Sequence, residues 1–482
     1  MIIQGASDRP VYIWVHNGNV EIRDAEKIWG TTTFECEKRI KEELNQPNAS
    51  VACIGPAGEN LVRFAAVVND SGHVAATGGL GAVMGAKKLK AVAVCGNYKV
   101  PVANEDELRE ASKRLIDANL SAFWGKMVHE GGFVAGLNIY VDLGLLPHKN
   151  CTYHTYPPEL IEGFANFRKR FKGKRKSCWA CPMNHLRVIE IDQCPYEGFV
   201  GEEPEAEDFC AWTLNIGNYN LDAAVYLSHI NDALGMDAKE SSFLVSLVME
   251  CYEEGIIDKE FTDSLELKWG NIDAAKVLLE KIARRDGPLG NILAEGLRRA
   301  SYLLGVPNKA VYFKGAGPHV YDFRAAVIGI LDLCISDVGS LQGSTSSLAP
   351  DPEMADVTTI VHVRGLMPFP ISRASKRHFV DSLILCHYNI NLLMPPITFE
   401  PYILDLVRAA TGWKDFTLKE ALTFSERITN LARVFSIRHG LRPEDEWPSP
   451  RMLEPLEDGP AAGLTLKPYY KGLLEAYYRV MG

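Results

Sequence analysis

The sequence predicts an α+β protein in which a partial β-rich N-terminal domain is followed by two mainly α-helical domains. Residues 10–100 contain short runs of β-branched and aromatic residues separated by turn residues, which is typical of strands. From about Asn104 onward, apolar residues recur at the spacing of amphipathic helices. The chain has 482 residues, of which 47% are hydrophobic, so it is long enough for several compact domains. We expect domains at residues 1–104, 105–308 and 309–482.

The expected elements begin with a hairpin, because Val11–His16 and Val20–Arg23 flank the turn dipeptide Asn17-Gly18. The strands expected after the hairpin are Val51–Ile54, Val62–Val68 and Ala91–Val94. The helices expected in the remaining chain are Glu105–Ala118, Leu221–Leu234, Ser242–Glu254, Ile272–Arg285, Ala374–Leu385, Pro401–Thr411 and Leu418–Arg433.

Composition and charge exclude several classes of function. The formal charge of −10 is spread along the chain, and the basic run Arg168–Lys176 is short, so we expect no nucleic-acid partner. The sequence contains no apolar run of the length of a membrane span, so we expect no membrane insertion. Most of the eleven cysteines stand alone in apolar surroundings, as reduced thiols do. These features favour a cytoplasmic protein.

A glycine-rich run, Thr77–Gly85, is followed by three lysines at 87, 88 and 90. Its glycine spacing is one residue too long for the dinucleotide fingerprint, and the Walker sequence is missing. A plain glycine turn between strands is the more common explanation of such a run. A loop whose backbone N–H groups contact phosphate is the alternative.

The most closely spaced cysteines are Cys178 and Cys181, with His185 four residues further on. Two thiolates at this spacing reach one metal ion or one cluster from a single turn, and a histidine can add a third ligand. An iron–sulfur cluster completed by a distant cysteine and a zinc site closed by Cys194 are equally compatible with the spacing. Structural cysteines are the third interpretation.

Two acidic motifs have both a structural and a functional explanation. Asp232-Ala-Leu-Gly235-Met-Asp237 ends an expected helix, and Gly235 suits the left-handed position after a last turn. Its two carboxylates can also accept hydrogen bonds from an N–H-rich heterocycle. The acidic run Glu202–Asp208 is typical of a solvated loop, although the apolar stretch after it can carry a carboxylate into a pocket as a general acid or base.

Taken in order, these segments resemble the aldehyde:ferredoxin oxidoreductase family along essentially the whole chain. IGPAGENLVRFAAVVND and TGGLGAVMGAKKLKAVAV resemble its β-domain, and CWACPMNH falls at its Cys-x-x-Cys-x-x-x-Cys cluster motif. EEPEAED falls at its Glu-rich segment, Asp232–Asp237 matches its DxxGxD pterin motif, and Asp381–Cys386 resembles its DxxGLC motif. ITNLARVFSIRHGLRPEDE and LEPLEDGP are similar to the family's ending.

The resemblance implies a tungstopterin, or molybdopterin, enzyme with a nearby [4Fe–4S] cluster that oxidises aldehydes or catalyses a related low-potential reaction. It implies that electrons leave to ferredoxin or another redox subunit. Glu207 would transfer protons beside the metal. The implied cluster ligands are Cys178, Cys181 and Cys386, with His185 at the position of the family's third cysteine. The residues implied to contact the pterins are Gly78, Gly79, Gly81, Asp232, Gly235, Asp237 and Asp381.

The sequence also departs from the family pattern. Ile384 replaces a glycine, Thr77 replaces an arginine, and no histidine occurs near Ser340–Gln342, where the family has its second catalytic residue. The family's ExxH intersubunit iron motif survives only as Tyr226-x-x-His229. The β-domain is shorter at its start than in the family, so we expect that another polypeptide supplies the missing half, that the chain is a truncated product, or that it is a reduced fold without cofactor. A cofactor-poor, non-catalytic paralogue or a subunit of a split oxidoreductase is the alternative function.

Overall fold

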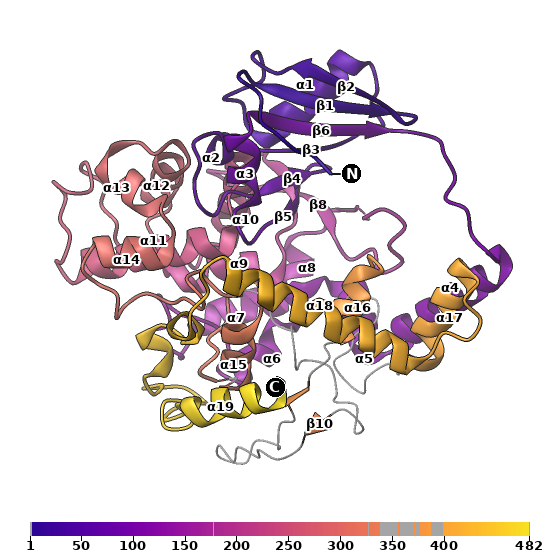
Figure 1. The fold of residues 1–482 in the computed structure, drawn as a ribbon. Coiled ribbons are helices and arrows are strands. Elements are labelled where there is room, and N and C mark those ends of the chain that lie inside the picture. Colours follow the sequence, from indigo (N-terminus) through magenta and orange to yellow (C-terminus); the bar gives the residue numbers. More distant parts are fainter. Residues whose placement is uncertain are drawn as a thin grey trace.

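The computed structural model describes residues 2–176, 178–325, 327–337, 355–356, 371–372, 376–386 and 399–481. A β-sheet formed by the first hundred residues lies against a larger body of helices, and the last helices run back across that body (Figure 1). The predicted α+β class is therefore confirmed. The predicted domain limits stay a prediction.

The N-terminal sheet has six strands in the order β2-β1-β6-β3-β4-β5. β1 and β6 are parallel, and the other neighbours are antiparallel. The predicted hairpin is confirmed, with Asn17 and Gly18 at φ 49° and 82°, as its turn requires. The strands are β1 (Val11–His16), β2 (Asn19–Asp24), β3 (Ser50–Cys53), β4 (Val67–Asn69), β5 (His73–Ala75) and β6 (Leu89–Cys95).

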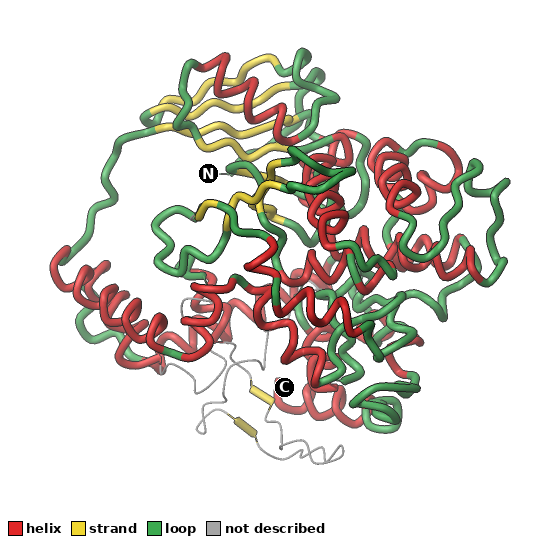
Figure 2. Tube along the Cα trace, turned by 180° about the vertical axis from the view of Figure 1, so that it is seen from behind, coloured by secondary structure: helices red, strands yellow, loops and turns green. Residues whose placement is uncertain are grey.

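One face of this sheet is covered by α1 (Thr33–Leu44), which crosses the strands in Figure 2. The helix begins where the Thr32 side chain accepts a hydrogen bond from the backbone N–H of Glu35. Its Cys36 and Ile40 are buried against Tyr12 and other side chains of the sheet. Burial of this apolar face fixes the sheet as a separate small core.

The segment between β3 and β6 binds the sheet to the helical body. The predicted strand Val62–Val68 lies in this segment, but only its end belongs to a strand, β4 (Val67–Asn69). The prediction is therefore wrong over most of its length. The reason lies in the backbone partners: the N–H of Arg63 donates to the carbonyl of Ala294 at 3.0 Å, and the N–H of Ala66 donates to that of Gly235 at 2.8 Å. Backbone groups that would pair in a sheet instead bond to the ends of helices.

The glycine-rich run forms a short helix, α3 (Leu80–Ala86), rather than the expected turn between strands. It packs against α2 (Pro56–Glu59). A side chain at Gly85 would overlap the carbonyl oxygen of Gly58, so the two helices approach more closely than any residue with a Cβ allows. The local sequence does not reveal this contact, which joins segments that are distant along the chain.

The helical body contains all four helices predicted for it. Leu221–Leu234 has the predicted limits, and Ala238–Glu253 begins earlier than predicted because Asp237 caps it. The helices of this region are α4 (Glu105–Ser121), α5 (Phe123–Gly131), α6 (Leu137–Asp142), α7 (Pro158–Ala165), α8 (Phe167–Arg170), α9 (Ala206–Trp212), α10 (Leu221–Leu234), α11 (Ala238–Glu253), α12 (Ile272–Arg284), α13 (Gly287–Leu293) and α14 (Leu297–Leu303).

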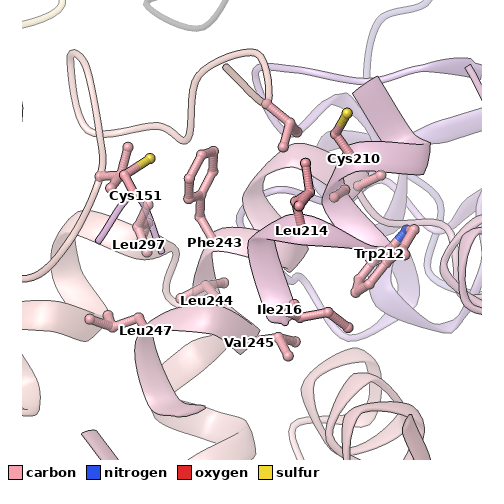
Figure 3. Close-up of a cluster of buried hydrophobic side chains, with 14 of the residues drawn as sticks. Cys151, Cys210, Trp212, Leu214, Ile216, Phe243, Leu244, Val245, Leu247 and Leu297 are labelled. Atoms are coloured by element: carbon pink, nitrogen blue, oxygen red, sulfur yellow. The ribbon is translucent and has the colours of Figure 1, made fainter. Parts of the chain in front are cut away.

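The main core forms where α9, the following 3-10 turn Leu214–Ile216 and α11 meet. Trp212, Leu214 and Phe243 are fully buried there (Figure 3). A small antiparallel sheet that was not predicted, β7 (Lys174–Arg175), β8 (Arg187–Glu190) and β9 (Val200–Glu202), leads into α9. Dense packing of this kind fixes the start of α9 in space.

The C-terminal elements are α15 (Val327–Ile335), β10 (Ala355–Asp356), β11 (Ile371–Ser372), α16 (Lys376–Ser382), α17 (Phe399–Thr411), α18 (Leu418–Arg438) and α19 (Tyr470–Met481). The three predicted helices are found here as α16, α17 and α18. α17 lies beside α4 (Figure 1), and Leu115 of α4 shares a buried cluster with Ile403 and Phe416. None of the described helices combines the length and the apolar composition that a membrane span needs.

Candidate functional site

A cavity of about 420 Å³ lies between the β4–β5 turn, the start of α9, the α10–α11 junction and the loop that precedes α15. This volume falls in the usual range for small-molecule sites. The lining residues are Gly72, His73, Val74, Ala76, Phe133, Tyr140, Leu186, Glu202, Glu203, Pro204, Glu205, Ala206, Glu207, Asp208, Ser228, Asp232, Asp237, Ala238, Lys239, His319 and Tyr321. Three predicted site residues, Glu207, Asp232 and Asp237, are thus brought together.

The acidic run is part of this cavity wall, so the solvated-loop interpretation is wrong. Glu203 is buried and pairs with Arg168 at 2.7 Å. Glu202 pairs with Lys176 at 2.7 Å. These cations compensate two of the acids, and the apolar stretch after the run carries the following carboxyl groups inward.

Glu207 lies in the first turn of α9, whose later residues Phe209 and Trp212 are fully buried. The rigid core therefore positions this carboxyl group. Its Oε2 forms a hydrogen bond with Nδ1 of His319, and both residues line the cavity. A paired carboxylate and imidazole can accept and return a proton near neutral pH.

The loop that carries His319 is fixed by buried charges. Asp322 has no exposed side-chain surface, and its carboxylate accepts hydrogen bonds from His154 Nε2 at 2.7 Å and Arg324 Nη2 at 2.7 Å. Upstream, the N–H of Gly317 donates to the buried carboxyl group of Glu240 on α11. The loop is held on both sides of His319.

Two cavity carboxyl groups have strongly raised pKa values. Burial, with Glu207 as the next cause, raises the pKa of Asp208 to about 7. Burial also raises the pKa of Asp232 well above its usual range, with Asp208 adding to the effect. Among the described residues neither group forms an ion pair, although the charge of Lys239 partly offsets the rise at Asp208.

Asp237 is held more tightly than Asp232. It caps α11, with Oδ1 accepting from the backbone N–H of Lys239 at 2.9 Å. Its Oδ2 accepts from the N–H of Thr77 at 3.0 Å, which ties the start of the glycine-rich run to α11. The Lys239 ammonium donates to Thr77 Oγ1 at 3.2 Å.

The predicted glycines lie beside this cap but do not line the cavity. Gly79 caps α3, and a side chain at Gly79 would overlap the carbonyl oxygen of Arg63. At Gly81 a Cβ would lie 2.5 Å from the carbonyl oxygen of Ala66. Gly78 has open space around it. Close backbone packing explains Gly79 and Gly81, and contact with a phosphate stays a prediction.

The two Asp-x-x motifs form the same kind of helix end. At the end of α10, the N–H of Met236 donates to the backbone carbonyl of Asn231, and the N–H of Gly235 donates to the backbone carbonyl of Asp232. Gly235 has a φ of 75°. At the end of α16, the N–H of Leu385 donates to the backbone carbonyl of Val380, and the N–H of Ile384 donates to that of Asp381. Both are Schellman motifs. The structural explanation of Gly235 is confirmed.

The two aspartates of these motifs nevertheless have different surroundings. Asp232 lines the cavity, whereas Asp381 lies exposed on α16 and is not among the lining residues. Its role as a pterin contact stays a prediction. Ile384 is 94% exposed.

Three of the predicted cluster ligands are neighbours. Cys178 and Cys181 lie in the loop between β7 and β8, with the N–H of Cys181 bonded to the carbonyl of Cys178 at 3.1 Å. Burial raises the pKa of Cys178 to about 11, and Cys181 and Cys386 both contribute to the shift. The charge of Cys386 therefore reaches Cys178 although the two residues are distant in sequence.

His185 contacts the cavity wall. Its Nε2 is 3.2 Å from Oε1 of Glu205, and its ring meets the edge of Phe133 with a centroid separation of 4.7 Å. Within the described ranges, no three His, Cys, Asp or Glu side chains are arranged as a ligand set for a metal ion.

The donor chemistry of these residues fits the cofactors that the sequence predicts. A pterin presents ring N–H and amino groups, which complement the carboxyl groups of Asp208 and Asp232 in the cavity wall. Thiolates are the preferred protein ligands of iron–sulfur clusters, and Cys178, Cys181 and Cys386 supply three.

Sequence reasoning missed several cavity residues, among them His319, Tyr140 and Tyr321. His319 follows a Gly-Ala-Gly-Pro stretch, and Tyr140 and Tyr321 lie in segments without a recognisable motif. The predicted absence of a histidine near Ser340–Gln342 falls outside the described residues. No periodicity or spacing marks His319, because its position depends on the buried partners of Asp322.

Comparison with known proteins covers the whole chain. The family model "Aldehyde ferredoxin oxidoreductase, N-terminal domain" matches residues 1–96, and "Aldehyde ferredoxin oxidoreductase, domains 2 & 3" matches residues 108–482. The structure is also similar to a chain of the active site complex BamBC of benzoyl coenzyme A reductase with 1,5-dienoyl-CoA. That likeness has a TM-score of 0.79 at 23% identity and covers 99% of this chain and 78% of the other.

Two relatives from Pyrococcus furiosus align with the entire chain. The tungsten-containing aldehyde ferredoxin oxidoreductase is 33% identical over 495 residues, which is 78% of that protein. The WOR-like subunit of aliphatic sulfonate oxidoreductase is 30% identical over 516 residues, which is 77% of that protein. Together with the two family models, these matches show that the chain belongs to the aldehyde ferredoxin oxidoreductase family.

Proposed function

We propose that this chain is a tungstopterin-dependent oxidoreductase that oxidises an aldehyde, or catalyses a related low-potential reaction, and passes electrons through a [4Fe–4S] cluster. Molybdopterin is the variant of the cofactor that the same residues would accept. The observation that carries the proposal is the meeting of Glu207, Asp232 and Asp237 at one cavity.

Each of these residues has a distinct role in the proposed enzyme. Asp232, with Asp208 beside it, accepts hydrogen bonds from the N–H groups of the pterin. Asp237 holds Thr77 and thereby the glycine-rich run next to the cavity. Glu207 takes up or releases the proton that accompanies substrate oxidation, as a general base or acid. The bound tungsten centre supplies the two-electron redox chemistry.

Cys178, Cys181 and Cys386 would bind the cluster at the edge of the cavity wall. Their proximity supports this assignment, because Cys181 and Cys386 both act on the pKa of Cys178. His185 is the proposed fourth ligand. To bind the cluster, its ring has to give up the contact between Nε2 and Oε1 of Glu205. An imidazole ligand in place of a thiolate raises the reduction potential of a cluster.

The experiment is elemental analysis for tungsten, molybdenum, iron and zinc in anaerobically purified protein, for the wild type and four variants. We expect tungsten or molybdenum with about four irons per chain. Asp232→Asn lowers tungsten and leaves iron unchanged, whereas Cys181→Ser lowers iron. Asp192→Asn and Cys194→Ser serve as matched controls, since Asp192 pairs with Arg170 and Cys194 bonds to Glu197.

Other results would contradict parts of the proposal. Equal loss of tungsten and iron in Asp232→Asn would assign Asp232 to helix packing. Zinc that disappears in Cys194→Ser would establish a zinc site in place of the cluster. Protein without tungsten or molybdenum in every preparation would favour the non-catalytic paralogue.

We further propose that the electron acceptor is a ferredoxin or another acidic redox subunit. Trp179, between the two cysteines, is 96% exposed. Lys172, Lys174 and Arg175 are exposed close to it, and within the described chain they form no ion pair. We call Lys172, Lys174, Arg175 and Trp179 the basic rim. A cytoplasmic location is proposed as well, because none of the eleven cysteines, all of which lie in the described ranges, forms a disulfide.

A further inference from the structure

We propose that His319 is a positioning residue that holds the Glu207 carboxylate in its working orientation through a hydrogen bond from Nδ1. The inference rests on the proposed role of Glu207 as the group that exchanges protons with the substrate. A carboxylate oxygen has no hydrogen to donate, so Nδ1 of the imidazole is the donor in this pair.

The surroundings of the pair are those of a functional group rather than of a core contact. The side chains of His319 and Glu207 are 17% and 20% exposed, and both line the cavity. The His319 ring lies over Tyr321 at 6.4 Å, and Tyr321 contacts Tyr140 at 5.2 Å between ring centroids. One end of the cavity is therefore formed by a carboxylate, an imidazole and two phenols.

The loop fixes the imidazole before any ligand binds. The N–H of Tyr321 donates to the carbonyl of His319 at 2.6 Å. Glu240 holds Gly317 on one side, and Asp322 anchors the other side through His154 and Arg324. A catalytic group that is oriented by a second, rigidly held group keeps its geometry through the reaction.

The first test observes the hydrogen bond itself and needs no cofactor. Protein labelled with ¹⁵N-histidine should show strongly downfield N–H protons, among them a first from His319–Glu207 and a second from the buried pair His154–Asp322. Glu207→Gln should shift only the first signal upfield, and His319→Gln should abolish it. The His154 signal is the internal control for correct folding.

The second test uses the atom that forms the bond. In His319→Asn, the side-chain amide nitrogen takes the place of Nδ1, whereas in His319→Gln it takes the place of Nε2. We therefore expect His319→Asn to retain most of the activity, and His319→Gln to lower kcat by about 10- to 100-fold with little change in KM. His439→Gln, at an exposed position outside the cavity, is the control.

The outcomes separate this inference from the proposed function. If the wild type binds no tungsten, the proposed function fails, and the NMR experiment still decides whether the pair exists. If the first signal is missing, or if His319→Gln is as active as His319→Asn at equal tungsten content, the positioning role is refuted. A packing role alone would favour Gln, which is closer to histidine in size.

Discussion

Buried carboxyl groups around the cavity differ in charge state because their partners differ. Burial by itself would raise the pKa of Asp322, but Arg324 and His154 outweigh it and hold the pKa well below its usual range. Glu240 is buried to the same degree and receives only backbone hydrogen bonds, from Leu297 and Gly317. Burial therefore raises the pKa of Glu240 to about 7.

This pKa predicts a pH dependence of stability. In the unfolded chain a glutamate titrates near pH 4.3. Between that pH and about 7 the folded state binds the additional proton, so the contribution of Glu240 to the free energy of unfolding falls as the pH rises. In Glu240→Gln, the free energy of unfolding should fall less with rising pH than in the wild type, by up to about 3 kcal/mol between about pH 5 and pH 8. Urea unfolding measures this difference.

The control for this prediction is Glu260→Gln, because Glu260 is exposed. Its unfolding free energy should follow the wild-type pH profile. An unchanged profile in Glu240→Gln would show that Glu240 is ionised throughout this range in the folded protein.

At the residue scale, sequence reasoning found the acids and missed their partners. Glu207, Asp232 and Asp237 were predicted and lie at one cavity. Residue types at fixed spacing identify such groups, since helix ends and acidic runs are local patterns. His319 was missed because only the folding of a distant loop brings it to Glu207. Contacts of this kind depend on tertiary packing, which a single sequence does not display.

Elements were predicted best where their ends carry local signals. Leu221–Leu234 has the predicted limits because Asn220 caps its start and Gly235 ends it. The glycine-rich run was predicted as a turn, but it contains the helix α3, in which Gly85 packs closely against Gly58. The small sheet β7–β8–β9 was not predicted, because its strands are only two to four residues long and such short runs show no clear alternation.

The end of α16 predicts a stabilising substitution. Ile384 occupies the left-handed position of a Schellman motif at φ 58°, where glycine is preferred and a β-branched residue is strained. Its side chain is 94% exposed, so little packing is lost on its removal. Ile384→Gly should raise the free energy of unfolding by about 1 kcal/mol, measured by chemical denaturation.

Ile384→Ala is the matched comparison, because it removes the branched side chain and keeps a Cβ at positive φ. Its stabilisation should be smaller than that of the glycine variant. If both variants are less stable than the wild type, the exposed isoleucine makes a contact that outweighs the backbone strain.

At the scale of the whole molecule, the basic rim allows a test of the proposed electron acceptor. Reversing the charge of Lys174 and Arg175 together, in Lys174→Glu/Arg175→Glu, should slow reduction of an acidic ferredoxin about tenfold or more at low salt. Reduction of a small dye should be unaffected, since it needs no docking surface. Stopped-flow measurements at several salt concentrations would check this. Lys471→Glu on α19 is the control, and an equal effect there would argue against a specific rim.

The connection from β6 to α4, residues 96–104, is almost entirely exposed (Figure 1). The sheet is attached to the helical body elsewhere, through backbone bonds between residues 63–66 and the ends of α10 and α13. A side chain at Gly55 would overlap the carbonyl oxygen of Leu234, so this joint excludes side chains and leaves little freedom for sliding. Continuity of the chain therefore raises the local concentration of the two parts during folding, while their final alignment depends on direct contacts such as this joint and the bond between Thr77 and Asp237.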